Sequence, residues 1–149
     1  MYAKDTATNV VKKEIDYLNK IIEKYPNDPW GYNNRGVAYN DLGNYDEAIV
    51  DFTKAIDLDP NDAQEYINRG STYIQKQNFV QAIADLNKAL ELKPDNAHVY
   101  FKRAEANYFK KEYNKAFADV HEAKTLGYKL DKEDFEFFGE LKKASGREK

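Results

Sequence analysis

Apolar and small residues recur along this chain with the three- and four-residue spacing of an amphipathic helix, and polar residues fill the positions between them. Tyr32, Gly36 and Tyr39 follow this spacing, and Ala48 and Phe52 resume it after an interruption. The interruption is a short polar stretch with a glycine near its end, which is typical of a helix terminus. The pattern therefore predicts two helices joined by a tight turn.

The same pattern returns with a period of 34 residues, because Pro26, Pro60 and Pro94 stand that far apart and each begins a similar turn phrase. A proline ends the helix before it, so these residues separate one helical pair from the next. The columns that keep this period include Tyr32, Tyr66 and Tyr100; Arg35, Arg69 and Arg103; Gly36, Gly70 and Ala104; Ala48, Ala82 and Ala116; Asp51, Asp85 and Asp119; and Ala55, Ala89 and Ala123. A fixed period of this size predicts a solenoid of stacked helical hairpins.

The whole chain, residues 1–149, is therefore predicted to form one all-α domain. Two further amphipathic runs flank the hairpins and are expected to cap the exposed faces of the first and last unit. The first run carries Val11, Ile15, Leu18 and Ile22, and the last carries Phe135, Phe138 and Leu141. The predicted order is a capping helix at 8–25, hairpins at 29–62, 63–96 and 97–130, and a capping helix at 131–145.

The repeated phrase from Tyr32 through Arg35, Gly36 and Tyr39 to Ala48, Phe52 and Pro60 resembles the tetratricopeptide repeat (TPR) signature. The third hairpin departs from it at Asn107, where the others have tyrosine, and at Tyr128, where they have proline. The resemblance implies an α-solenoid with a right-handed superhelical twist, whose first helices line a concave groove. It also implies a scaffold for protein and peptide binding.

Two columns predict a charged pair inside every hairpin. Each arginine of the Arg35 column precedes an aspartate by 16 residues, and in an antiparallel hairpin with its turn near Gly43 these positions face each other. The expected structural ion pairs are Arg35–Asp51, Arg69–Asp85 and Arg103–Asp119. Arginines directed at an acidic ligand are the alternative interpretation.

The resemblance places the binding surface on the groove face of the first helices. The candidate peptide-binding residues on that face are Trp30, Asn33, Asn34, Val37, Gln64, Ile67, Asn68, Ile74, His98, Phe101, Lys102, Glu105 and Phe109. We expect Asn34 and Asn68 to form an amide ladder suited to a peptide backbone, and Ile67, Ile74, Phe101 and Phe109 to act as apolar anchors. Solvated asparagines and aromatics packed on neighbouring repeats are the alternative.

Some TPR domains hold acidic chaperone C-termini with a clamp of lysines, asparagines and arginine. The matching positions here are Asn33, Val37, Asn68, His98 and Lys102. Only Asn68 agrees with that clamp, and Val37 removes a hydrogen-bonding group, so we do not expect chaperone-tail recognition in this mode.

Composition narrows the remaining classes of function. The formal net charge of −3 does not favour nucleic-acid binding, the absence of cysteine excludes disulfides and thiolate zinc sites, and no apolar run is long enough for membrane insertion. His98 and His121 have no partner at a catalytic or metal-binding spacing, so we expect no enzyme, no metal and no cofactor.

The sequence therefore predicts a non-catalytic protein–protein interaction module that binds a peptide or protein segment in its groove, as a monomer. The alternative is an assembly protein that self-associates through its repeats or caps. The compartment stays open between the cytoplasm, which is favoured, and the periplasm, which requires a signal peptide to have been removed.

Overall fold

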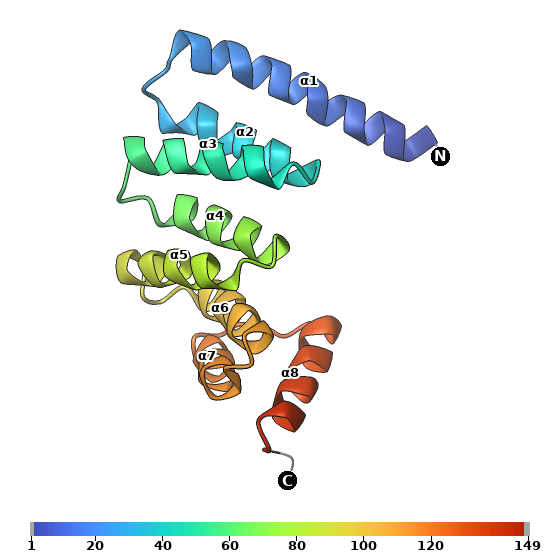
Figure 1. Ribbon diagram of the computed structural model, residues 1–149, viewed down its shortest axis with the longest axis vertical. Helices are drawn as coiled ribbons and strands as arrows, with labels where there is room; N and C mark the ends of the chain where they lie inside the picture. The colour runs from blue at the N-terminus through green and yellow to red at the C-terminus, as the bar shows by residue number, and fades with distance from the viewer. Residues whose placement is uncertain (1, 148–149) are drawn as a thin grey trace.

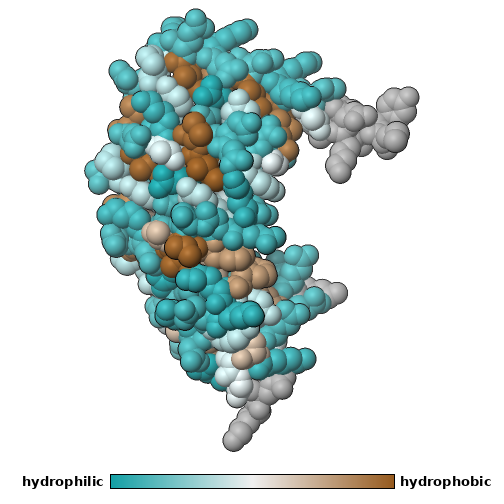
Figure 2. Space-filling view, in the orientation of Figure 1, coloured by the Kyte–Doolittle hydropathy of each residue, from teal (hydrophilic) through white to brown (hydrophobic). Residues whose placement is uncertain are grey.

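A computed structural model describes residues 2–147, with the backbone alone described for residues 2–7, Lys132 and Phe135. In this range the chain is all-helical. The helices are α1 (Tyr2–Lys24), α2 (Pro29–Asp41), α3 (Tyr45–Leu58), α4 (Ala63–Gln75), α5 (Phe79–Leu92), α6 (Ala97–Phe109), α7 (Tyr113–Thr125) and α8 (Lys132–Ala144). Figure 1 shows them stacked in chain order, with α1 and α8 at opposite ends. The space-filling view shows a curved molecule that is hollowed along one long side (Figure 2). The fold is the predicted TPR solenoid.

The turn residues that follow Pro26, Pro60 and Pro94 lead into the first helix of each hairpin. The side chains of Asp28, Asp62 and Asn96 accept hydrogen bonds from the backbone N–H groups of the next turn, at 3.0, 2.8 and 3.3 Å. The tyrosine column stabilises two of these turns. The hydroxyl groups of Tyr32 and Tyr66 donate hydrogen bonds to the carbonyl oxygens of the prolines six residues earlier. The repeated polar and aromatic residues thus set where each hairpin starts.

Small side chains allow the two helices of a hairpin to approach closely. A Cβ atom added at Gly36 would lie 2.7 Å from Phe52 Cε1, closer than two carbon atoms can pack. The alanine columns at Ala48 and Ala55 are fully buried, and their equivalents in the other two hairpins are buried as well. This confirms that the small columns have a packing function.

The N-terminal helix occupies the place of a second helix in the repeat register. It begins at Tyr2, earlier than the predicted residue 8, since residues 2–7 contain no proline or glycine that would end it. Ile15 and Leu18 are buried against the first hairpin. α1 therefore corresponds to the second half of a repeat.

The C-terminal helix occupies the place of a first helix, one period after α6. Its buried residue Leu141 joins the core of the third hairpin, and Phe138 stacks on Phe117 with ring centroids 5.7 Å apart. The side chain of Phe135, which was expected in the same stripe, lies outside the described residues. α8 thus corresponds to the first half of a repeat.

Candidate functional site

The three arginines form the ion pairs that their spacing predicts. In each pair Nε and Nη2 of the guanidinium donate to the two oxygens of the aspartate, at 2.7 and 2.7 Å for Arg35, 2.8 and 2.8 Å for Arg69, and 2.9 and 2.6 Å for Arg103. The three aspartates are buried, and these hydrogen bonds raise the pKa of each arginine above its usual value. Both charges of each pair are satisfied inside the protein, which favours a structural over a ligand-binding role.

Each arginine makes a further contact that the sequence analysis missed. The third nitrogen, Nη1, donates to a polar side chain on the preceding helix, and the acceptors are Asn19, Thr53 and Asn87 at 2.7, 2.9 and 2.7 Å. These acceptors precede their arginines by 16 residues, so they form another column at the 34-residue period. The arginines therefore join neighbouring repeats, and Asn19 confirms that α1 continues the register.

Side-chain amides are linked across the first two repeats on the predicted groove face. Asn68 Nδ2 donates to Asn33 Oδ1 at 2.8 Å, and Gln64 Nε2 donates to Asn68 Oδ1 at 2.9 Å. The expected ladder of Asn34 with Asn68 is wrong, because Asn34 donates instead to the Trp30 carbonyl oxygen of its own helix. We call Asn33, Asn68 and Gln64 the amide chain. Among the described residues, the Asn33 amide nitrogen and the Gln64 amide oxygen have no partner, so one donor and one acceptor are open.

Two of the predicted apolar anchors are buried in the core. Phe101 is 2% exposed because Tyr128 stacks on it at 4.7 Å and Phe137 packs edge-on at 5.7 Å. Burial raises the pKa of Tyr128 to about 12, so this ring covers Phe101 in its neutral form. Ile67 is likewise buried, in a core cluster that extends from Ile56 of the first repeat to Val99 of the third. The assignment of Phe101 and Ile67 as ligand anchors was therefore wrong.

The other two predicted anchors line an open pocket with both apolar and polar walls at the ends of α4 and α6. Its volume is about 580 Å³, and its lining residues are Ile74, Gln75, Gln77, Phe79, Glu105 and Phe109. Phe109 is 56% exposed and stacks on Phe79 with ring centroids 5.2 Å apart. We call this cavity the Phe109 pocket. Phe79 was missed because it lies on α5, whereas the candidate binding surface was placed on the first helices of the hairpins.

The remaining groove residues are exposed or half-buried and nearly neutral in sum. Trp30 and Val37 are exposed apolar side chains on α2. Lys102 pairs with Glu105 at 3.0 Å. Burial and the charge of Lys102 lower the pKa of His98, which favours its neutral form. This face suits a ligand with little net charge.

The described residues contain no group of histidine, cysteine, aspartate and glutamate side chains that could hold a metal ion. None of the helices in the described part of the chain has the length and apolar composition needed to cross a bilayer.

Family models match the repeat region of the chain. A tetratricopeptide repeat model matches residues 29–62, a second tetratricopeptide repeat model matches residues 52–84, and a TPR repeat model matches residues 70–110. A model of the protein prenyltransferase alpha subunit repeat matches residues 11–42. No curated protein matches the chain.

Solved structures with the same fold include MamA and the first TPR domain of RPAP3. The crystal structure of MamA matches with a TM-score of 0.85 and 22% identity, over 96% of this chain and 83% of that chain. MamA 41-end from Desulfovibrio magneticus RS-1 matches with a TM-score of 0.84 and 20% identity, over 91% of this chain and 76% of that chain. The first TPR of Spaghetti (RPAP3), bound to the HSP90 peptide SRMEEVD, matches with a TM-score of 0.72 and 29% identity, over 80% of this chain and 92% of that chain.

Proposed function

Because the chain belongs to the tetratricopeptide repeat family, a family that typically mediates protein–protein interaction, we propose that it is a non-catalytic module whose groove binds an extended segment of another polypeptide. The observation that carries the proposal is the position of the amide chain and the Phe109 pocket along one stripe of α4. Gln64, Asn68 and Gln75 are four and seven residues apart, so their side chains share one helix face.

The spacing along this stripe defines the segment that fits. Asn68 belongs to the amide chain and Gln75 lines the Phe109 pocket, and seven residues of helix rise about 10 Å. About three residues of extended peptide cover the same length. The proposed ligand therefore presents backbone amide groups to the open donor and acceptor of Asn33 and Gln64. It also presents an aliphatic or aromatic side chain about three residues further along.

Apolar contact supplies most of the affinity in this proposal. The exposed face of Phe109 and the side chain of Ile74 offer surface that a ligand removes from water, whereas the amide chain provides direction and register. Since Lys102 and Glu105 neutralise each other, a strongly acidic or basic peptide gains nothing from the groove.

The HSP90 peptide is a ligand of RPAP3, and we do not propose it for this chain. Asn68, one position of the two-carboxylate clamp, already shares its side chain with Asn33 and Gln64. Val37, at another position of the clamp, has no polar group in its side chain. The peptide SRMEEVD is therefore a negative control, and we expect it not to bind.

The experiment selects binders from a displayed library of 12-residue peptides and measures their affinities by fluorescence anisotropy. We expect the selected peptides to carry an apolar anchor residue. Phe109→Ala should weaken the binding of these peptides about tenfold or more. Val50→Ala is the matched control, because Val50 is an exposed apolar residue on α3, away from the pocket. Equal affinities for Phe109→Ala and the wild type would exclude the groove as the binding surface. Circular dichroism of each variant verifies that it remains folded.

Self-association is the second candidate function, and exposed residues on α1 favour it. Tyr17 occupies the column of Asp51, whose members face the first helix of their own hairpin. Tyr17 is 58% exposed and Val10 is 60% exposed. A second copy that packs on this face would give a mass that rises with concentration in sedimentation experiments, and Tyr17→Lys would abolish the rise. A constant monomer mass would eliminate this candidate.

A further inference from the structure

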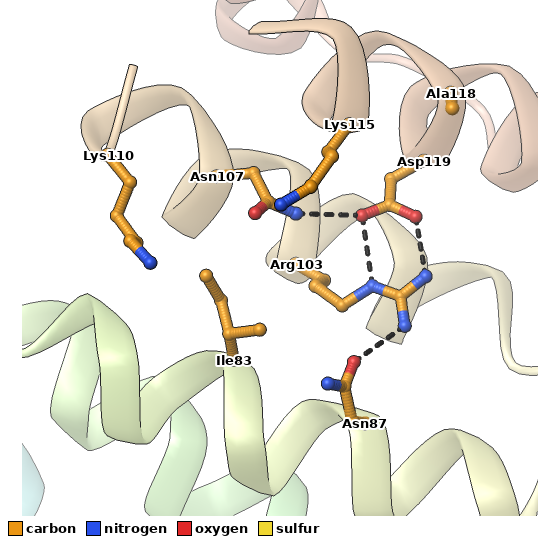
Figure 3. Close-up of a pocket in the computed structure, with 8 residues that line it drawn as sticks. All are labelled: Ile83, Asn87, Arg103, Asn107, Lys110, Lys115, Ala118 and Asp119. Carbon is orange, nitrogen blue, oxygen red and sulfur yellow. Dashed lines mark hydrogen bonds and ion pairs between the residues drawn. The ribbon is translucent and has the colours of Figure 1, made fainter. Parts of the chain in front are cut away.

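A second cavity lies between α5, α6 and α7, at residues that have no part in the groove (Figure 3). Its volume is about 420 Å³, which is within the range of small-molecule sites. The lining residues are Ile83, Asn87, Arg103, Asn107, Lys110, Lys115, Ala118 and Asp119. We call it the Asn107 pocket.

Hydrogen bonds hold the side chains at one wall of this pocket. Arg103 binds Asp119 through two nitrogens and donates with the third to Asn87 at 2.7 Å, and Asn107 Nδ2 donates to Asp119 at 3.2 Å. Figure 3 shows the four side chains joined in the order Asn107, Asp119, Arg103 and Asn87. Asn107 is buried, so its amide has a fixed position. The pocket is therefore preorganised before any ligand enters.

The other hairpins provide an internal comparison for this pocket. Tyrosine stands at the place of Asn107 in both, as Tyr39 and Tyr73. The equivalent cavity of the first hairpin, about 380 Å³, is lined by Arg35, Tyr39, Asp46, Glu47, Val50 and Asp51. It is thus acidic, with glutamate where the third hairpin has Lys115. The two cavities are similar in volume, but in the third hairpin Asn107 adds a side-chain amide to the wall and Lys110 and Lys115 line the pocket.

The free polar groups define what the Asn107 pocket can bind. Lys110 has no carboxylate partner among the described residues, and Lys115 contacts only Glu112, at 3.3 Å on the surface. The Asn107 oxygen and the Asn87 nitrogen are not engaged by any described residue. Two ammonium groups, one amide donor and one amide acceptor therefore surround a space that Ile83 borders with apolar surface.

We propose that the Asn107 pocket binds a small organic anion that carries a carboxylate and a hydroxyl group. The carboxylate lies between Lys110 and Lys115, and the hydroxyl donates to Asn107 while Asn87 donates to a ligand oxygen. The negative charge of Asp119 at the inner wall repels the carboxylate of the ligand, which therefore lies at the opening of the pocket. This site is independent of the proposed peptide groove.

The test is a titration of the full chain, labelled with ¹⁵N, by heteronuclear NMR at constant ionic strength. The probes are malate, which has carboxylates and a hydroxyl, succinate, which lacks the hydroxyl, and inorganic phosphate. We expect saturable shifts at the side-chain amides of Asn87 and Asn107 with malate, with a dissociation constant of about 1 mM. Succinate is expected to bind several-fold more weakly because nothing donates to the Asn107 oxygen.

Variants separate the site from general attraction of anions. We expect the affinity for malate to fall about tenfold or more in the double variant Lys110→Ala/Lys115→Ala and in Asn107→Tyr. The tyrosine is the residue of the other two hairpins, so this variant is compatible with the fold. Lys12→Ala/Lys13→Ala is the matched control, since it removes the same charge from an exposed face of α1 and should leave malate binding unchanged.

Three results would overturn the proposal. Shifts that grow linearly with malate, or malate affinity that is equal in Asn107→Tyr and the wild type, would show that no such site exists. Saturable binding of phosphate with no response to malate would assign the lysines to a different anion. Binding of a glutamate-rich peptide with no response to malate would assign the pocket to an acidic side chain of a protein.

Discussion

Glu65 is predicted to make the stability of this protein fall as the pH rises from acid to neutral. The residue lies in the first turn of α4 and is 5% exposed. Its Oε2 atom is buried without a hydrogen-bond partner in the described part of the chain. Gly31 and Val99 occupy the same place in the neighbouring repeats, so the position belongs to the core between repeats.

Burial, together with the smaller effect of the negative charges of Asp62 and Asp59, raises the pKa of Glu65 to about 7. In the unfolded chain the carboxyl has its ordinary pKa of 4.5. Below pH 4.5 the Glu65 carboxyl is protonated in both the folded and the unfolded state, so its burial costs little stability. Between the two values the folded state retains a proton that the unfolded state has released, so stability falls as the pH rises, and the loss is complete above the folded pKa.

The size of the loss follows from the difference between the two pKa values. A pKa difference of one unit corresponds to about 1.4 kcal/mol, so the folded protein should lose about 3 kcal/mol between pH 4 and pH 8 through this group. A neutral side chain at this position does not titrate, so it cannot cause this loss of stability. We therefore expect the free energy of unfolding of Glu65→Gln to equal that of the wild type near pH 4 and to exceed it by about 3 kcal/mol at pH 8.

The assay is urea denaturation followed by circular dichroism, with wild type and variant compared at each pH so that the titration of every other group cancels. Glu23→Gln is the matched control, because it makes the same substitution at an exposed position of α1. The titration of the Glu65 carboxyl carbon in ¹³C NMR gives its pKa directly. A difference between Glu65→Gln and wild type that does not change with pH, or a measured pKa near 4.5, would refute the reasoning.

Two further predictions concern the packing of the hairpins. Asp85→Ala leaves the guanidinium of Arg69 without its carboxylate and should cost about 3 kcal/mol in urea denaturation, whereas an unchanged midpoint would contradict the role of the pair. Gly36→Ala places a methyl group 2.7 Å from Phe52 and should cost about 1 to 2 kcal/mol. Gly139→Ala, where the added methyl meets nothing within 4 Å, should instead raise stability by up to about 1 kcal/mol, and equal effects of the two substitutions would contradict the packing argument.

The helical hairpins and their ion pairs could be predicted because each depends on residues close in sequence. A helix, a tight turn and an antiparallel helix place Arg35 opposite Asp51 whatever the rest of the chain does, and repetition at 34 residues supplies two further instances. The same spacing of 16 residues counted backwards from Arg35 leads to Asn19. A search for polar residues on both sides of each arginine would have found the contact between repeats.

The groove could be predicted only in part, because its surface depends on a helix outside the repeats. Phe101 has the position of a groove residue, but Tyr128 and Phe137 cover it. The sequence gives a signal in Tyr128, which replaces the proline that ends the other hairpins. It does not give the path of the chain into α8, which decides what that tyrosine contacts. Similarly, Asn34 and Asn33 are neighbours in sequence, and only the angle between α2 and α4 decides which of them meets Asn68.

Departures from the repeat columns show where this chain differs from a generic solenoid. A residue that follows its column is explained by packing that all three repeats share, so it carries no information about a particular function. Glu65 in a core column and Asn107 in a tyrosine column cannot be explained in this way, since each gives up packing that its equivalents provide. Glu65 leaves a buried oxygen without a partner, which is a cost to stability with no visible compensation. Asn107 compensates through its bond to Asp119 and also places a side-chain amide in the wall of a cavity. The second departure is therefore the one that the structure connects to ligand binding.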